Sequence, residues 1–429
     1  MLAISMLILF FVLLFLGMPI AFVIGIVGLT MLIIADVPLE IIIQRSFAGV
    51  NNFSYLALPL FVLAGNIMGK GGLTRRLMAF ANVFTRKLTG GTGITTVLTT
   101  ALFSSVSGST VATTYAVGSV LVPRLKEEKY SNSFIASIIG PAGVLGLIIP
   151  PSITMVILGI TANISIGDLF IAGILPGLIL TVALSTYVWY MSKRAGFGNR
   201  TEDKITSKEF WKVTRQAFFP LLTPIFILGS IFSGYATATE AAVVAVVYGF
   251  ILTLIYKELS FNKLKTILAD SAVTSAVILM IISMANVFTY VLTINHIPEA
   301  VSGFFLDFAE SPLIFLVVVS VILLFLGMLT EVTSLIVLLT PIFMPIAVEF
   351  GLDPIHFGMV MIINFALANV TPPVGLSLIA GASVTDRKMG IEDTLPYILH
   401  VLFIIAVMVL LIIFVPSIST FLPNLLGGE

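Results

Sequence analysis

Two clusters of small and hydroxyl-bearing residues interrupt apolar stretches of the chain, at residues 104–110 and 327–334. Hydroxyl oxygens and free carbonyl oxygens at such places suit a hard monovalent cation, and the N-termini of short helices attract carboxylates. Both features bind ions without making or breaking covalent bonds. The residue types therefore predict a site for a small cation together with a small anion.

The two clusters belong to a repeated segment, because a shift of 222 residues superimposes the pattern that follows each of them. Each copy continues into a helix-breaking segment that ends in Pro-Pro, and these segments cover residues 140–151 and 364–373. Interrupted hydrophobic segments at corresponding places in two halves of a chain point to the binding site of a secondary transporter. We take these paired interruptions as the predicted site.

The composition is that of a membrane protein. Of the 429 residues, 59% are hydrophobic and 10% are charged, whereas soluble domains carry roughly 25% charged residues. The apolar runs are long and continuous, which favours membrane-spanning helices over the short alternating strands of a β-barrel. The net charge of +0 argues against a nucleic-acid partner, and the absence of cysteine excludes disulfides and thiolate chemistry. We expect a multi-pass α-helical protein in a lipid bilayer.

Charged residues between the apolar stretches predict opposite orientations for the two copies. Residues 88–122 have basic residues on both flanks, so we expect a hairpin that enters and leaves on the cytoplasmic side. Residues 312–348 have acidic flanks, so we expect a hairpin that enters from outside. Residues 133–162 and 355–382 then cross the membrane as broken helices. The predicted fold is an all-α polytopic membrane protein, an inverted-repeat transporter with two re-entrant helical hairpins and two broken helices.

The N-terminal apolar stretch, residues 2–35, would be ~50 Å long as a single helix, against a hydrocarbon core of ~30 Å. We expect Gly17-Met18-Pro19 to divide it into two short helices, and one long tilted helix is the alternative. The stretch lacks the basic region and the cleavage site of a secretory signal. Residues 1–16 are therefore expected to be retained as a helix.

Sodium ions are expected where each cluster meets the helix break of its own copy. The predicted ligands of the first ion are Ser105, Ser107, Gly108, Gly140, Ala142 and Gly143. The predicted ligands of the second ion are Gly327, Thr330, Asn369, Val370 and Thr371. The alternative is that these small residues only permit close helix packing and capping.

The substrate is expected to contact hydroxyl groups of the same tips and breaks. The predicted contacts are Ser109, Thr110, Ser152, Thr154, Glu331 and Thr333. Glu331 is the one ionisable residue within either cluster, and an acid inside the membrane is a functional residue by default. We expect it to accept hydrogen bonds from a substrate hydroxyl or amide, or to act on cation binding. A helix cap beside Thr330 is the alternative.

The sequence does not support an enzyme. The segment Gly-Asn-Ile-Met-Gly-Lys at residues 65–70 departs from a phosphate loop, because its spacing is one residue short and no Ser or Thr follows the lysine. Paired carboxylates, a metal cluster and an activated nucleophile are all missing from the pattern. We expect no catalytic residue and no cofactor, with sodium ions only as coupling ions.

Five short segments carry a family resemblance: residues 17–19, 107–112, 150–152, 237–242 and 371–375. They read Gly-Met-Pro, Ser-Gly-Ser-Thr-Val-Ala, Pro-Pro-Ser, Thr-Ala-Thr-Glu-Ala-Ala and Thr-Pro-Pro-Val-Gly. In these segments the chain resembles the large membrane subunit of tripartite ATP-independent periplasmic (TRAP) transporters. The resemblance implies location in the bacterial inner (cytoplasmic) membrane, coupling to a sodium gradient, and two partners, a small four-helix membrane subunit and a periplasmic substrate-binding protein.

The resemblance also implies an elevator mechanism, in which a transport domain slides against a scaffold. The transport domain would consist of a hairpin and a broken helix from each copy, residues 88–162 and 312–382. The scaffold would consist of N-terminal helices with an interfacial segment (1–87), helices and linkers (163–311) and a C-terminal helix (383–429). Family substrates are small organic acids, namely C4-dicarboxylates, keto acids and sialic acids.

The charge pattern gives a preference among these acids. The two expected hairpins and two broken helices contain no Lys or Arg, so only sodium ions and helix N-termini, about half an elementary charge each, are available to an anion. This balances one carboxylate more readily than two, because an uncompensated buried charge is costly. Together with the many hydroxyl groups, it favours sialic acid over a C4-dicarboxylate.

Two other functions remain open at this point. A stand-alone sodium–anion (dicarboxylate) symporter would need no binding protein, so dependence of uptake on an added binding protein distinguishes a TRAP transporter from it. A channel or a structural membrane subunit would not accumulate substrate. Saturable, sodium-driven accumulation therefore excludes both of these.

The opposite charge bias of two loops predicts their sides of the membrane. We expect residues 193–215 on the cytoplasmic side and residues 299–310 on the periplasmic side. Single cysteines placed in each loop of this cysteine-free chain should react with an impermeant thiol reagent from opposite sides. Labelling of both loops from one side would overturn the inverted repeat.

Overall fold

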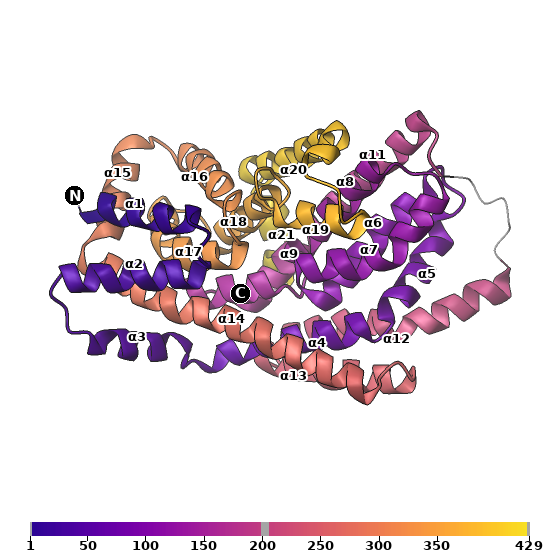
Figure 1. Ribbon diagram of the computed structural model, residues 1–429, viewed down its shortest axis with the longest axis horizontal. Coiled ribbons are helices and arrows are strands. Elements are labelled where there is room, and N and C mark those ends of the chain that lie inside the picture. Colours follow the sequence, from indigo (N-terminus) through magenta and orange to yellow (C-terminus); the bar gives the residue numbers. More distant parts are fainter. Residues whose placement is uncertain (1, 199–205, 427–429) are drawn as a thin grey trace.

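The computed structural model describes residues 2–198 and 206–426, and these residues form an elongated bundle of helices (Figure 1). Outside the repeats the helices are α1 (Leu2–Phe15), α2 (Ile20–Ile34), α3 (Glu40–Val50), α4 (Ala57–Lys70), α5 (Leu73–Thr85), α11 (Ile166–Ala195), α12 (Ser207–Phe232), α13 (Ala238–Ile255), α14 (Phe261–Ile294), α15 (Ile297–Phe308), α20 (Leu395–Phe414) and α21 (Ser417–Leu426). The first repeat contains α6 (Gly91–Ser107), α7 (Thr110–Glu127), α8 (Asn132–Gly143), α9 (Leu145–Ile148) and α10 (Ile153–Ala162). The second repeat contains α16 (Pro312–Gly327), α17 (Val332–Glu349), α18 (Pro354–Ala368) and α19 (Leu376–Thr385).

The membrane-protein prediction is confirmed. Eight helical stretches in the described residues are long and apolar enough to cross a membrane. Other apolar helices are shorter, among them α2, α16, α18 and α19. The expected N-terminal division is also present: Gly17 adopts a left-handed conformation (φ +78°) and Pro19 precedes α2, so two helices replace one long one. The loop expected at residues 193–215 is shorter than predicted, because α12 begins at Ser207. Residues 199–205 of that loop lie outside the described residues.

Both predicted hairpins are present as helix pairs. Helix α6 ends at Ser107, Gly108 turns the chain in a left-handed conformation (φ 61°), and α7 begins at Thr110. Helix α16 ends at Gly327 and α17 begins at Val332. The side from which each hairpin enters the bilayer stays a prediction.

The break of the first repeat falls at the end of the expected segment, residues 140–151, because residues 140–143 stay helical. Helix α8 runs through Pro141 and ends at Gly143, and the break of the first repeat falls at residues 149–152, between α9 and α10. A Cβ atom on Gly140 would lie 2.7 Å from the carbonyl oxygen of Ser377. Gly140 is therefore required by close helix packing, a role that sequence alone does not separate from helix breaking.

The two repeats interlock. Helix α19 of the second repeat packs against α7 and α8 of the first, and α10 of the first packs against α17 of the second. The hydroxyl of Ser377 donates to the carbonyl oxygen of Gly140 (2.5 Å), which is available because the N–H of Val144 bonds to Pro141 instead. Each repeat thus contributes a helix to the packing of the other.

A layer of long helices flanks the repeats on one side. Helices α4, α13 and α14 lie side by side along one edge of the molecule, with α2 and α3 against α14 (Figure 1). Helix α14 has 34 residues, and it also contacts α17 of the second hairpin. Sequence reasoning missed α3, α5, α15 and α21, because their mixed polar and apolar residues resemble interfacial loops.

The close approach at Gly140 makes a stability prediction. We expect Gly140→Ala to lower the free energy of unfolding by about 1–3 kcal/mol, because the added methyl group must displace the backbone of α19. The control is Gly229→Ala in α12, where no atom lies within 4 Å of the added Cβ. Thermal unfolding in detergent should show a lower Tm for Gly140→Ala and an equal or higher Tm for Gly229→Ala. Equal Tm values for all three proteins would contradict the packing role.

Candidate functional site

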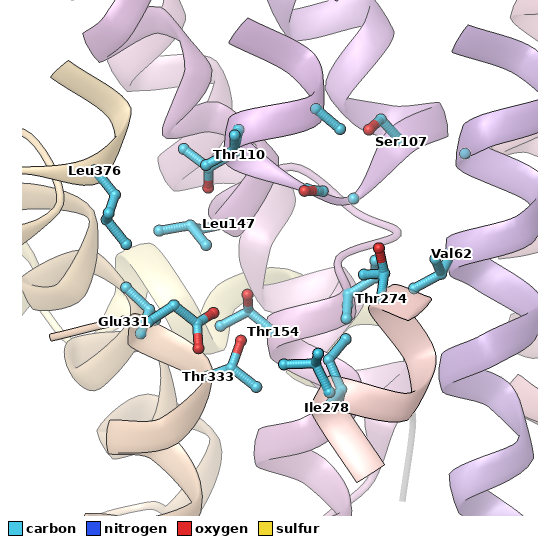
Figure 2. Close-up of a pocket in the computed structure, with 18 of the residues that line it drawn as sticks. Val62, Ser107, Thr110, Leu147, Thr154, Thr274, Ile278, Glu331, Thr333 and Leu376 are labelled. Atoms are coloured by element: carbon cyan, nitrogen blue, oxygen red, sulfur yellow. The ribbon is translucent and has the colours of Figure 1, made fainter. Parts of the chain in front are cut away.

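A cavity of ≈480 Å³ lies where the two hairpin tips meet the two interruptions, with α4 and α14 forming the opposite wall (Figure 2). This volume is that of a site for a small organic molecule. Aliphatic side chains such as Val62, Leu147 and Ile278 form much of the lining. The polar lining residues are Asn66, Ser107, Ser109, Thr110, Thr154, Thr274, Glu331, Thr333 and Asn369.

Four helices begin at this cavity: α7, α10, α17 and α19. Residues of their first turns line it, for example Thr110, Thr154, Thr333 and Leu376. Their N-cap residues are Ser109, Ser152, Glu331 and Gly375; the hydroxyls of Ser109 and Ser152 do not cap a backbone N–H, and Gly375 has no side chain that could. Helices α8, α11, α12, α13, α14, α16 and α18 begin with a side-chain cap, and α2, α3, α4, α5, α6, α9, α15 and α20 begin without one, so it is the convergence of the four helix starts that distinguishes the cavity. The helix ends at the cavity thus present backbone donors and positive dipole ends to a ligand.

The first hairpin tip and the first interruption form a single unit. The N–H of Ile153 donates to the carbonyl oxygen of Gly108 (3.2 Å). A Cβ atom on Gly108 would lie 2.9 Å from the carbonyl oxygen of Pro151, so only glycine permits this approach at a positive φ. The peptide bond between Pro150 and Pro151 is cis. The starts of α7 and α10 are therefore fixed relative to each other.

The second interruption is closed by Asn369. The N–H of Ser377 donates to both the carbonyl oxygen (3.1 Å) and the side-chain Oδ1 (3.2 Å) of this residue. The hydroxyl of Thr371 donates to the carbonyl oxygen of Leu367 (2.6 Å). Pro372-Pro373 is also a cis pair. Residues 369–375 therefore form a compact turn with one face on the cavity.

Several buried hydroxyl groups around the first tip have no hydrogen-bond partner among the described residues. They belong to Ser104, Thr110, Thr113 and Ser152. A buried hydroxyl left without a partner is costly, so these groups leave hydrogen-bonding capacity open where the end of α6 meets the starts of α7 and α10.

Glu331 occupies the N-cap position of α17, yet its carboxylate is available to the cavity. It accepts a hydrogen bond from the hydroxyl of Ser334 (3.4 Å). Figure 2 shows the carboxylate on the same side of the cavity as the hydroxyls of Thr154 and Thr333. Of the described residues that line the cavity, Glu331 alone is ionisable. The cap position and the functional position that we considered from sequence are therefore the same place.

The structure separates the other predicted residues. Ser107, Gly108, Ser109 and Asn369 line the cavity, whereas Ser152 is buried behind it. The hydroxyl of Ser105 donates to the carbonyl oxygen of Leu102 (2.7 Å) and does not line the cavity.

The remaining predicted residues lie at helix contacts or beside the cavity. Gly140, Ala142 and Gly143 lie within α8, and a Cβ on Gly143 would lie 2.0 Å from the hydroxyl oxygen of Thr114. Gly327 contacts Ala368 at the end of α18. Thr330, Val370 and Thr371 lie next to the second tip and the second interruption without lining the cavity.

Sequence reasoning missed the wall formed by α4 and α14. Asn66 lines the cavity and donates to the hydroxyl of Ser271 on α14 (2.9 Å), and Thr274 lines it one turn further along. A Cβ on Gly65 would lie 2.9 Å from the carbonyl oxygen of Ser107. The sequence signal for this wall was Asn66, an amide side chain within an apolar helix, which we interpreted only in the comparison of residues 65–70 with a phosphate loop.

A second cavity of ≈410 Å³ adjoins the first and shares Gly65, Asn66, Ser107 and Ala112 with it. Its lining also includes Lys70, Arg75, Lys263 and Glu258. Basic residues mark the cytoplasmic side of a membrane protein. The two cavities together reach from the hairpin tips towards that side.

Comparison with known proteins finds relatives that belong to one family of transporters. Residues 7–418 match the family described as "Tripartite ATP-independent periplasmic transporter, DctM component". The chain is 36% identical to the isethionate TRAP transporter permease protein DctMQ of Oleidesulfovibrio alaskensis, over 94% of this chain and only 64% of that longer protein. It is 34% identical to the C4-dicarboxylate TRAP transporter large permease protein DctM of Rhodobacter capsulatus, over 96% of each. It is 33% identical to the sialic acid TRAP transporter large permease protein SiaM of Vibrio cholerae, over 97% of each.

Two solved transporter structures resemble the fold. MtrF of Neisseria gonorrhoeae has a TM-score of 0.61 at 16% identity, over 90% of this chain and 86% of that one. The YdaH transporter of Alcanivorax borkumensis has a TM-score of 0.52 at 12% identity, over 88% of each chain. At these identities the likeness concerns the fold alone.

Proposed function

The chain belongs to the DctM component family of tripartite ATP-independent periplasmic transporters, and from this premise we propose that it carries a small organic acid together with sodium ions. It is a multi-pass protein of the bacterial inner membrane and not an enzyme. The observation that carries the proposal is the convergence of the N-terminal ends of α7, α10, α17 and α19 on one cavity.

These helix ends supply the anion-binding part of the site. Each N-terminus carries about half a positive elementary charge, together with backbone N–H donors. A carboxylate placed among the first turns of α7, α10, α17 and α19 would accept hydrogen bonds from these donors. No arginine or lysine lines the cavity among the described residues, so the backbone is the main source of attraction.

Sodium supplies the remaining positive charge. We propose that one ion lies at the end of α6, where the hydroxyls of Ser104, Thr110 and Ser152 lack partners. The last turn of a helix also leaves carbonyl oxygens without helical donors, which suits a cation near the end of α6. A bound sodium ion there would offset part of the charge of Glu331 and raise the affinity for the anion. Binding of the two solutes would then be coupled.

The preferred substrate on this basis is a monocarboxylate with several hydroxyl or amide groups, such as sialic acid. The cavity offers hydroxyls on three of its walls, at Ser109, Thr154 and Thr274, and an acceptor at Glu331. A second substrate carboxylate would find no basic partner among the described residues that line the cavity. The relatives named for C4-dicarboxylates, sialic acid and 2,3-diketo-L-gulonate are about equally similar to this chain, so the preference rests on the cavity.

We propose that the interlocked repeats move as a transport domain against a scaffold that includes α4 and α14. Contact with α4 occurs at Gly65 and Gly69, whose added Cβ atoms would lie 2.9 Å from Ser107 and 3.2 Å from Phe103. Glycines give a surface without protruding side chains, which suits sliding. The second cavity would be the route by which substrate leaves to the cytoplasm.

The proposed partners are a small four-helix membrane subunit and a periplasmic binding protein that delivers the substrate. The permease of Oleidesulfovibrio alaskensis is a longer DctMQ protein of which this chain spans 64%, which fits a second membrane subunit fused to the same kind of chain. Uptake that needs an added binding protein would support this assembly over a stand-alone symporter.

The unpartnered hydroxyls predict how sodium stabilises the protein. At sodium concentrations of about 100 times the Kd, binding adds about 2.7 kcal/mol to the free energy of unfolding. We expect the Tm of the purified protein to rise in sodium chloride relative to choline chloride, and Ser152→Ala to lose most of this rise. The control is Thr340→Val, which removes an equally buried, unpartnered hydroxyl in the middle of α17. An unchanged sodium effect in Ser152→Ala would exclude this hydroxyl as a ligand.

Glu331 provides the test of the substrate site. In proteoliposomes with the small subunit and a binding protein, Glu331→Gln should reduce uptake at least tenfold at unchanged Tm, because it removes the charged acceptor. Glu349→Gln is the control, since this residue lies at the other end of α17 and bonds to Ser302. In a competition assay with these proteoliposomes, added sialic acid should inhibit uptake of the transported substrate. If succinate or malate inhibits uptake and sialic acid does not, the monocarboxylate preference is wrong.

A further inference from the structure

A groove of ≈610 Å³ lies between α12 and α13, away from the cavities described above. Its lining combines Trp211, Lys212 and Arg215 near the start of α12 with the apolar residues Phe219, Leu252 and Ile255. Trp211 and Ile255 are 69% and 66% exposed. The groove therefore joins two cations to apolar side chains and is open to the surroundings.

The wall of the groove is held by a tyrosine at a proline site. Pro220 lies inside α12 and has no N–H, so the carbonyl oxygen of Gln216 lacks its usual helical donor. The hydroxyl of Tyr256 donates to this oxygen (3.3 Å). The guanidinium of Arg76 lies 3.7 Å from the centre of the Tyr256 ring and holds the ring from the other side. The groove is thus a built feature of the fold and not a chance gap between two side chains.

The two cations of the groove are available to a ligand. Among the described residues, neither Lys212 nor Arg215 makes an ion pair, whereas neighbouring Glu209 pairs with Arg86 (3.1 Å). Both cations are exposed. They lie near the start of α12, at the end of the helix that the basic residues assign to the cytoplasmic side.

We propose that this groove binds an anionic phospholipid, with the phosphate on Lys212 and Arg215 and an acyl chain along Phe219, Leu252 and Ile255. Three features fit this ligand together. Basic pockets between membrane helices on the cytoplasmic side bind lipid phosphates. Tryptophan and tyrosine prefer the level of the headgroups, where Trp211 and Tyr256 would lie. The apolar residues continue from that level towards the membrane interior.

The occupant is a lipid and not a helix of another subunit, because of how the charges are placed. A helix packed on this groove would bury two unpaired cations, which is costly unless acidic partners reach both. A phosphate at the headgroup level contacts both cations and leaves them partly hydrated. The site is independent of the proposed transport function, since none of its residues lines either cavity at the hairpin tips.

The chain contains two tryptophans, Trp189 and Trp211, which makes a direct test possible. In Trp189→Phe the fluorescence comes from Trp211 alone. The purified variant is reconstituted into vesicles of phosphatidylcholine that contain a brominated quencher lipid, either brominated phosphatidylglycerol or brominated phosphatidylcholine. We expect phosphatidylglycerol to quench at a several-fold lower mole fraction. Introducing both Lys212→Gln and Arg215→Gln into Trp189→Phe should abolish the difference in quenching between the two lipids. Lys212→Gln alone should reduce this difference.

The matched control removes the same charge elsewhere on the same side. Lys193→Gln with Arg194→Gln, at the end of α11, should leave the quenching preference of Trp211 intact. Equal quenching by the two lipids in Trp189→Phe would overturn the proposal. A preference that survives in Lys212→Gln with Arg215→Gln, or that disappears equally in the control, would overturn it too, because general surface charge would then explain it. Loss of quenching by both lipids when the small subunit is present would show that protein covers the groove.

Discussion

The structure depends on the need to satisfy backbone groups at helix ends that lie deep inside a membrane protein. An unpaired N–H or carbonyl costs several kcal/mol there, so most membrane helices end at the surface. This chain ends helices at its centre in both repeats. It satisfies some of these ends internally, as between Gly108 and Ile153 or Asn369 and Ser377, and leaves others facing the cavity. The ends that remain free are the ones that a ligand can use.

The interlocking of the repeats follows from the same need. A short helix such as α10 or α19 cannot bury its own apolar surface alone, so each packs against the opposite repeat. Ser377 of the second repeat completes the hydrogen bonding of α8 in the first. Neither half of the site can therefore form without the other. The two repeats therefore pack as one unit around the cavity.

Much of the fold could be predicted, because helix breaks, hydrophobic length and charge bias are local properties of a sequence. The hairpin tips, the division at Gly17 and the second interruption are where the pattern placed them. The first break lies only at the end of the predicted segment, because Gly140 at its start serves a contact with Ser377 of α19, which is 237 residues away in sequence. Asn66 and Thr274 were missed for the same reason: only the packing of α4 and α14 brings them to the cavity. Local sequence patterns therefore predict where helices end, whereas the residues that line the cavity depend on contacts between helices that are distant in sequence.

The choice of backbone donors over basic side chains has a consequence for an alternating carrier. An arginine in the cavity would hold an anion with a fixed full charge in every state, and release would then be slow. Helix dipoles act over about one turn, so small displacements of α4 and α14 relative to the hairpins change how well water and ions screen them. If sodium binds as we propose, its departure would remove much of the remaining attraction for the anion, and the affinity for the anion would fall. Lys70, Arg75 and Lys263 lie outside this inner site, in the cavity leading towards the basic side.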